Sequence, residues 1–229
     1  MIAHPGYPIG ARPAFNVTRT LLLVLVAAAA AGGFVAAIAG LGVTTHAGPA
    51  FEATNGPHVE VSALPGVELD RILGLPGLSE ASGPFPLVST SVRHDGKEAG
   101  LRLEGRPAGA TVVDHPVVGA GTWIRPRTIV LERDFARRFG VSPGDRVTVA
   151  GASGPLRLLV SGVAATTAGK ASGDALGWAL PETLRAVAPN NRMHGSTVVL
   201  RLSDPDRAAA YTRWIRDFYA GQGVVVHTR

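Results

Sequence analysis

Cysteine is absent from this 229-residue chain. Its absence excludes disulfides, thiolate catalysis and cysteine metal sites, but it says little about compartment, because many exported domains manage without cysteine. Lysine is rare, with only Lys97 and Lys170, so the pI near 10.4 reflects arginine used in place of lysine. No cluster of basic residues is interleaved with aromatics, which argues against nucleic-acid binding.

Motifs that carry catalytic chemistry are missing as well. The pair Gly169-Lys170 is followed by Ala171, where a phosphate-binding loop needs Ser or Thr to bind magnesium. The seven histidines include no pair at i and i+4, so no metalloprotease helix or clear zinc site is expected. His94-Asp95 and Asp114-His115 are sequence neighbours, whose side chains would point apart on a strand. We therefore expect no catalytic, cofactor-binding or metal-binding residue, and we expect that the protein is not an enzyme.

Charge is missing from Thr20 to Val43, which reads TLLLVLVAAAAAGGFVAAIAGLGV. A helix of this length would be about 36 Å long, enough to cross a hydrocarbon core of about 30 Å. The stretch therefore predicts a transmembrane helix at 20–43. Two alternatives remain: a cleaved signal peptide, whose apolar core is usually about 7–15 residues, and a buried helix of a soluble protein, which would carry a polar stripe.

The flanks of this stretch predict its orientation. Residues 1–19 contain Arg12 and Arg19 and no acid, and no Lys or Arg follows the stretch before Arg71. The positive-inside rule then makes 1–19 a cytoplasmic tail, with everything after about residue 45 outside. Residues 44–56 read as a linker. The expected localisation is the cell membrane, with a single pass and an extracytoplasmic main domain.

The portion after the predicted span is large enough for one sizeable core or two small lobes. Two of the 22 basic residues lie before residue 46, so the remaining 20 face 17 acids and the net charge there is about +3. This nearly balanced charge is ordinary for a globular domain.

Hydrophobic patterning predicts an α+β fold in two lobes. One is a split βαβ lobe formed by residues 57–93 and 175–229, and the other is an inserted β-rich lobe at 94–174. The split lobe is expected to contain strands at 58–63, 86–93, 196–202 and 224–227, and helices at 67–74, from Pro181, and at 206–220. The β-rich lobe is expected to contain strands at 128–131, 146–150 and 156–163, and one helix at 132–139 ended by Gly140.

Aromatic residues in the last predicted helix form a stripe. Tyr211, Trp214, Ile215 and Phe218 fall at positions 0, 3, 4 and 7, the spacing of one helix face. This spacing predicts that the stripe packs on its own sheet. Trp123 and Trp178 are likewise expected to be core residues or contacts between lobes, with a substrate-facing surface as the minority alternative.

Several segments match a known family in their order and spacing. They are Arg19–Leu22 at the start of the predicted span, Gly119–Ile124, Ile129–Phe139, Gly140–Val147 and Leu158–Val163. Over roughly residues 18–229 the chain resembles the FtsX-like and MacB-like permeases of ABC transporters, namely their first transmembrane helix and the MacB-like periplasmic core domain. The individual motifs are common, and their order after a single span makes the resemblance specific.

The resemblance implies a permease component that couples ATPase-driven motion to an extracytoplasmic domain for export or mechanotransmission. Its expected partners are the membrane, the remaining permease spans or a second permease chain, and indirectly a cytoplasmic ABC ATPase. Three further spans would follow Arg229 in that family, so this chain alone is not expected to transport anything. The alternative is a free-standing single-span protein with an extracytoplasmic protein-binding domain. An anchored hydrolase is a distant third, for want of a nucleophile and a base.

Overall fold

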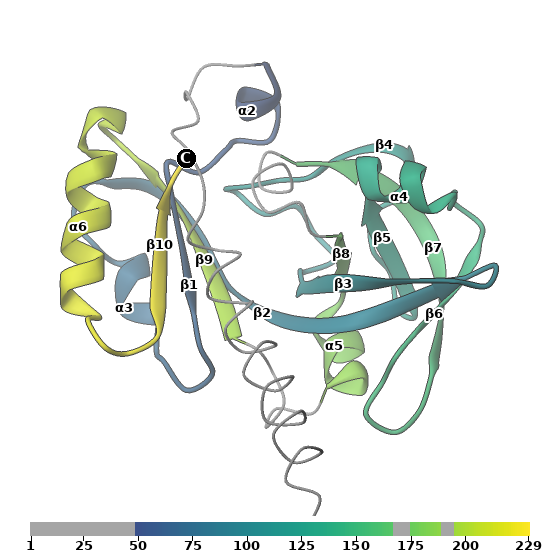
Figure 1. Ribbon diagram of the computed structural model, residues 1–229. Helices are drawn as coiled ribbons and strands as arrows, with labels where there is room; N and C mark the ends of the chain where they lie inside the picture. Colours follow the sequence, from purple (N-terminus) through teal and green to yellow (C-terminus); the bar gives the residue numbers. More distant parts are fainter. Residues whose placement is uncertain (1–48, 167–174, 189–194) are drawn as a thin grey trace, which may run out of the picture. The chain divides into compact units, whose positions relative to one another are not determined.

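A computed structural model describes residues 49–166, 175–188 and 195–229 (Figure 1). All of them belong to one compact unit. The predicted tail at 1–19, the predicted span at 20–43 and residues 44–48 of the predicted linker lie outside the described residues. Within the described ranges, no helix combines the length and the apolar character needed to cross a membrane.

The described residues form an α+β fold dominated by strands, as the patterning predicted. The strands are β1 (Val59–Ala63), β2 (Leu78–His94), β3 (Lys97–Gly105), β4 (Val117–Gly121), β5 (Thr128–Glu132), β6 (Arg146–Val149), β7 (Leu156–Ala165), β8 (Leu176–Ala179), β9 (Gly195–Leu202) and β10 (Val224–Thr228). The helices are α2 (Pro49–Ala53), α3 (Asp70–Leu73), α4 (Arg133–Phe139), α5 (Pro181–Val187), the 3-10 turn η3 (Pro205–Arg207) and α6 (Ala208–Phe218).

One part of the fold is an antiparallel sheet in the order β10-β1-β9-β2, here called the four-stranded sheet. The helices α3 and α6 pack on one of its faces (Figure 1). Their contact buries a cluster that includes Val59, Val61 and Ile72 together with Ile215 of α6. The alternation in β1 supplies apolar side chains to this cluster, because Val59 and Val61 point to the helices while Glu60 and Ser62 point to the other face.

A second part is a ring of six strands. Following the hydrogen bonds from β2 leads through β3, β8, β5, β7 and β6 and back to β2, so these strands close on themselves; we call them the strand ring. Apolar side chains of alternate residues fill its interior, among them Val92, Leu103, Ile129 and Val160. The helices α4 and α5 add their apolar faces to the same cluster.

Strand β2 belongs to both parts. Its first half pairs with β9 and its second half with β3, and both pairings meet at Leu87. Patterning predicted only its second half, because Gly83-Pro84 interrupts the first. The pairing with β9 shifts register at that point, and Gly83 adopts φ +112°. A Cβ there would lie 2.6 Å from the carbonyl oxygen of Thr197, so only glycine fits.

Local chemistry explains the helix predicted at 132–139. The Glu132 carboxylate accepts a hydrogen bond from the backbone N–H of Phe135 at 2.8 Å, which caps the start of α4. Gly140 ends the helix in the left-handed region at φ +79°. This helix prediction is confirmed.

Strand β8 pairs with β3 and β5 and so forms part of the strand ring. The lobe boundaries proposed from the sequence stay a prediction.

The prediction that the aromatic stripe packs on its own sheet is wrong for two of its members. Trp214 and Phe218 are 47% and 49% exposed. The buried row of α6 consists of Ala208, Thr212 and Ile215 and continues at Tyr219, which follows the helix directly. Spacing alone cannot tell which of two adjacent rows faces the sheet, and of the predicted stripe Ile215 is the member that lies in the buried row. Trp178, in contrast, is fully buried, as predicted.

A buried ion pair between β1 and Arg229 predicts acid sensitivity. The Arg229 guanidinium donates from Nε to the Glu60 carboxylate at 2.9 Å. Burial would raise the pKa of Glu60, but Arg229 and Arg102 outweigh it and hold that pKa below its ordinary 4.5. Because the folded-state pKa is depressed, this stabilisation is complete above pH 4.5 and is lost as the pH falls below it.

The substitution Glu60→Gln should therefore flatten the acid limb of the stability curve. Between about pH 5 and pH 3 the free energy of unfolding of the wild type should fall more steeply than that of the variant. Near neutral pH the variant should be less stable by about 1–3 kcal/mol, the worth of hydrogen bonds to charged groups. Urea denaturation at a series of pH values measures both. Parallel curves would contradict the role assigned to Glu60.

Candidate functional site

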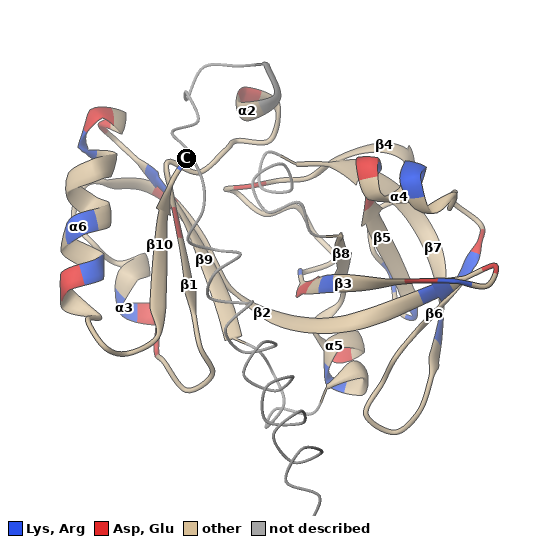
Figure 2. Ribbon diagram, viewed as in Figure 1, with Lys and Arg blue, Asp and Glu red and all other residues tan. Residues whose placement is uncertain are grey.

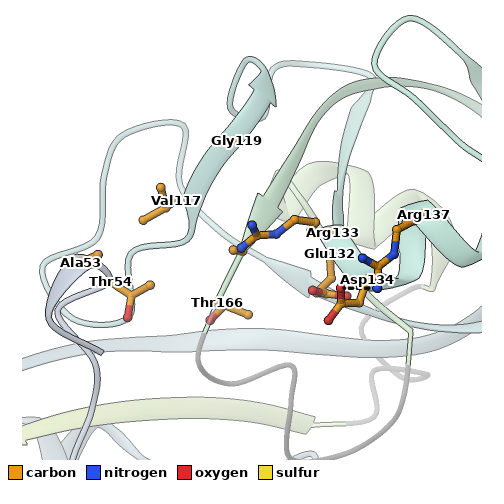
Figure 3. Close-up of a pocket in the computed structure, with 10 residues that line it drawn as sticks. Ala53, Thr54, Val117, Gly119, Glu132, Arg133, Asp134, Arg137 and Thr166 are labelled. Atoms are coloured by element: carbon orange, nitrogen blue, oxygen red, sulfur yellow. Dashed lines mark ion pairs between the residues drawn. The ribbon is translucent and has the colours of Figure 1, made fainter. Parts of the chain in front are cut away.

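A pocket of about 430 Å³ opens where α2, β4, α4 and the end of β7 meet (Figure 3). Its charged lining comes from the start of α4, and its small and hydroxyl side chains come from the other elements. The lining residues are Ala53, Thr54, Val117, Gly119, Glu132, Arg133, Asp134, Arg137, Ala165 and Thr166.

The polar groups of this pocket are mostly engaged with one another or with the backbone. Glu132 caps α4, and Asp134 forms an ion pair with Arg137 at 3.1 Å, drawn as a dashed line in Figure 3. Thr54 donates its hydroxyl to the Phe51 carbonyl, and Thr166 donates to the Asp114 carboxylate. A nucleophile needs an adjacent base within hydrogen-bond reach. Thr166 and Asp114 are within that reach at 3.0 Å, but the Asp114 carboxylate is also paired with the buried Arg106 guanidinium, which makes it a weak base.

A buried cation is linked to this pocket through Asp114, which accepts from Thr166 of the pocket lining. The Arg106 side chain is 1% exposed and donates from Nε to Glu104 at 2.7 Å and from Nη2 to the Asp114 carboxylate. Its Nη1 donates to the Asp114 carbonyl at 3.0 Å. The guanidinium also stacks 3.7 Å from the centre of the Phe85 ring. One cation is therefore shared by two buried carboxylates from two segments.

Because Glu104 and Asp114 share one cation, the two carboxylates also repel each other. Burial raises the pKa of Glu104, and the Asp114 charge raises it further against the opposing effect of Arg106. Burial alone would lower the pKa of Arg106, but the two carboxylates outweigh it and raise that pKa. The Arg106 guanidinium therefore stays charged, and Glu104 is the member of the group whose ionisation is disfavoured.

The loop between β3 and β4 is fixed to neighbouring segments through this group. The backbone N–H of Asp114 donates to the Asn55 carbonyl at 3.0 Å, and that of His115 donates to Thr54 at 2.7 Å. The Asn55 amide donates in turn to Glu80 of β2. These bonds connect the strand ring, α2 and β2 in one network of polar contacts.

The two His/Asp pairs singled out from the sequence behave differently. His94 and Asp95 approach each other, with Nε2 and the carboxylate 3.4 Å apart, so the expectation that they point apart is wrong. Asp95 lies in the turn between β2 and β3 at φ +45° and not in a strand. For the other pair, the Asp114 carboxylate is held by Arg106, and the His115 Nδ1 has no hydrogen-bond partner among the described residues. Asp114 also accepts from the Thr166 hydroxyl at 3.0 Å, while its other carboxylate oxygen is held in the buried ion pair with Arg106.

A shallow apolar pocket of about 410 Å³ lies beside the exposed row of α6. Trp214 and Phe218 stack there with ring centres 5.4 Å apart and an interplanar angle of 14°. Leu75, Pro76 and Tyr211 contribute the other apolar walls. Across the described ranges, no group of three or more His, Asp or Glu side chains is placed to hold a metal ion.

Comparisons with known proteins find similarity in structure. No family model and no curated protein sequence matches the chain. The extracellular domain of the noncanonical ABC-type transporter YknZ from Gram-positive bacteria is 16% identical, with a TM-score of 0.46 over 74% of this chain and 99% of that one. The periplasmic region of MacB from Actinobacillus actinomycetemcomitans is 12% identical, with a TM-score of 0.44 over 75% and 88%.

A third solved structure, a domain of a putative permease protein from Porphyromonas gingivalis, is 17% identical with a TM-score of 0.44 over 75% and 88%. In structure the chain is therefore similar to an extracellular domain of an ABC-type transporter, a periplasmic region of MacB and a domain of a putative permease.

Sequence reasoning missed the buried cation, although one signal for it was present. Glu104 lies in β3, which ends at Gly105, and Arg106 follows directly, so the two stand two apart, the spacing that brings side chains to one face of extended backbone. The third member, Asp114, follows a loop, so its return to Arg106 could not be predicted from spacing. The turn at Asp95-Gly96, a strong hairpin signal between β2 and β3, was also missed.

Proposed function

We propose that this chain is the N-terminal part of an FtsX-like ABC transporter permease. In this proposal residues 20–43 anchor it in the cell membrane, residues 1–19 are cytoplasmic and residues 44–56 form the linker. The MacB-like core domain at 57–229 then lies outside. The absence of charge from 20–43, with arginines on one flank only, supports this arrangement.

The proposed role of the outer domain is to pass on motion that an ATPase drives across the membrane. Strand β2 is the observation that carries this role. It is hydrogen-bonded to β9 along its first half and to β3 along its second, so the four-stranded sheet and the strand ring share one backbone. A displacement applied to one part is transmitted along a continuous strand and not absorbed by a flexible linker.

The sidedness can be tested because the chain contains no cysteine to remove. Single variants Ala3→Cys and Ser153→Cys should be labelled differently by a membrane-impermeant maleimide added to intact cells. Ser153 lies in the exposed loop between β6 and β7, so its cysteine should be labelled at once. The cysteine at position 3 should react only after lysis. The reverse pattern would overturn the proposed topology and the transporter role with it.

The coupling can be tested through the DNA that follows the codon for Arg229. The proposal expects three further spans to be encoded there, with an ATPase gene alongside. Co-expression of these products with this chain should change the rate of ATP hydrolysis measured in membrane vesicles. If neither is encoded, the permease proposal fails and a free-standing binding domain replaces it. An unchanged hydrolysis rate would argue against coupling through this domain.

A further inference from the structure

A second pocket, of about 560 Å³, lies on the outer face of the strand ring and has a strongly basic lining. It is formed where β5 begins and where β6 and β7 run side by side, a region with basic positions in Figure 2. Its lining residues are Pro126, Arg127, Thr128, Arg146, Arg157 and Leu159. Three of these six are arginines and none is acidic.

Strand register explains why the arginines converge. Leu159 of β7 stands opposite Arg146 of β6 and beside Thr128 of β5. Arg157 precedes Leu159 by two residues, so it points to the same face. The alternate residues Leu158 and Val160 point the other way into the ring. The exposed face of these strands therefore presents two arginines next to an exposed leucine.

Arg127 is held beside them by a constrained turn. The Thr128 backbone N–H and its hydroxyl both donate to the Arg125 carbonyl, at 3.1 and 3.0 Å. The Arg127 carbonyl accepts from the backbone N–H of Leu159, which joins the turn to β7. Arg127 itself adopts φ +62°, a left-handed conformation that is unfavourable for a residue other than glycine. The chain thus tolerates strain where a glycine would be relaxed.

None of the three guanidinium groups is neutralised within the described part of the chain. The ion pairs there involve other residues, and no side-chain hydrogen bond of Arg127, Arg146 or Arg157 is present. Asp145, the acid next to Arg146, accepts instead from the backbone N–H of Ser142 at 2.8 Å. Like charges gathered on one face repel one another, and a bound anion would relieve that repulsion.

We propose that this pocket binds the phosphate group of a phosphate ester. A tetrahedral phosphate offers oxygens in several directions, so three guanidinium groups from three segments can donate to it at once. A carboxylate offers only two oxygens in one plane. The exposed Leu159 and Pro126 beside the arginines give apolar surface to the organic part of the ester. The ester can be a soluble molecule or the headgroup of a lipid, and this inference does not rest on the permease proposal.

Chemical modification of arginine by phenylglyoxal tests the site on the full chain in phosphate-free non-ionic detergent. Peptide mass spectrometry would give a rate for each arginine, alone and with inorganic phosphate, with glycerol 3-phosphate, or with phosphatidylglycerol in mixed micelles. At saturating ester, modification of Arg127, Arg146 and Arg157 should slow severalfold, because the reagent cannot reach a guanidinium that is bonded to the phosphate. Arg213, exposed on α6, should react at the same rate in every arm.

The pattern of protection distinguishes a soluble ester from a lipid headgroup. Protection by glycerol 3-phosphate supports a soluble ester, and protection by phosphatidylglycerol alone supports a lipid headgroup. Protection by inorganic phosphate as well would make the phosphate group itself the element recognised. Equal slowing of Arg213, or no protection in any arm, would overturn the proposal.

Variants sharpen the test. Arg146→Gln and Arg157→Gln should each weaken the apparent affinity for the protecting ester about fivefold, while Arg213→Gln should leave it unchanged. Arg127→Gly should weaken it similarly but keep or raise the melting temperature, because glycine relieves the left-handed conformation. That combination separates a binding role from a structural one. If Arg127→Gly left protection of the other two arginines unchanged, the three-arginine site would be wrong.

Discussion

Replacing Arg106 with alanine is expected to lower the free energy of unfolding by about 3–5 kcal/mol, the cost of breaking a buried ion pair by removing one partner. The substitution would leave Glu104 and Asp114 buried without their shared cation, and Phe85 without the guanidinium stacked on it. Urea denaturation of the full chain, followed by circular dichroism, measures the loss.

Two control variants show whether the loss is specific to the buried cation. Glu104→Gln should cost far less, because the amide oxygen can still accept from Arg106 Nε and one buried negative charge is removed. The raised pKa of Glu104 fixes the sign: its ionisation costs stability as the pH rises above the ordinary value of 4.5, and glutamine abolishes that dependence. Arg93→Gln, which breaks the exposed pair with Glu98, should have little effect. Equal losses in all three variants would contradict a special role for the buried cation.

Replacing Trp178 with alanine is the second change with a large expected effect, again about 3–5 kcal/mol. Its ring is fully buried in a cluster with Ile124, Val130 and Leu176 on the outer face of the strand ring. It also lies 6.0 Å from the Trp123 ring, so truncation removes an aromatic contact and leaves a cavity. The melting temperature of the full chain should fall by roughly 10 °C.

Trp214→Ala provides the control for this prediction. About half of the Trp214 surface is exposed, so its removal should change the free energy of unfolding by only about 0.5 kcal/mol. The same substitution at the two tryptophans is therefore expected to lower the free energy of unfolding by very different amounts. A loss at Trp214 as large as that at Trp178 would mean that the exposed row of α6 is covered in the folded protein.

The sequence predicted most of the strands and helices because their signals are local. Alternation in Val59–Ala63 and the cap and stop of the helix at Glu132 and Gly140 each depend on a few neighbouring residues. Local signals failed where a distant contact decides the outcome. Gly83 looks like an interruption in sequence, yet it lets β2 continue past Thr197 of β9.

The candidate sites were less accessible to sequence reasoning than the fold. The buried cation needs Asp114 to return to Arg106 after a loop, and the basic pocket needs Arg127 to stand beside Arg146 and Arg157 of β6 and β7. The path of a loop and of a turn brings Asp114 and Arg127 to their partners, and no short pattern in a single sequence encodes those paths. The amphipathic period of α6 was recognised, but the period could not tell which row faces the sheet.

The position of β1 has a consequence for how the chain folds during synthesis. Val59 pairs with Leu200 on one side and Thr228 on the other, so both partners of β1 are made long after it. The nascent strand leaves the ribosome with both edges unpaired, and pairings so distant in sequence form slowly. Until residue 228 has emerged, β1 is an open edge onto which another unfinished copy could add a strand.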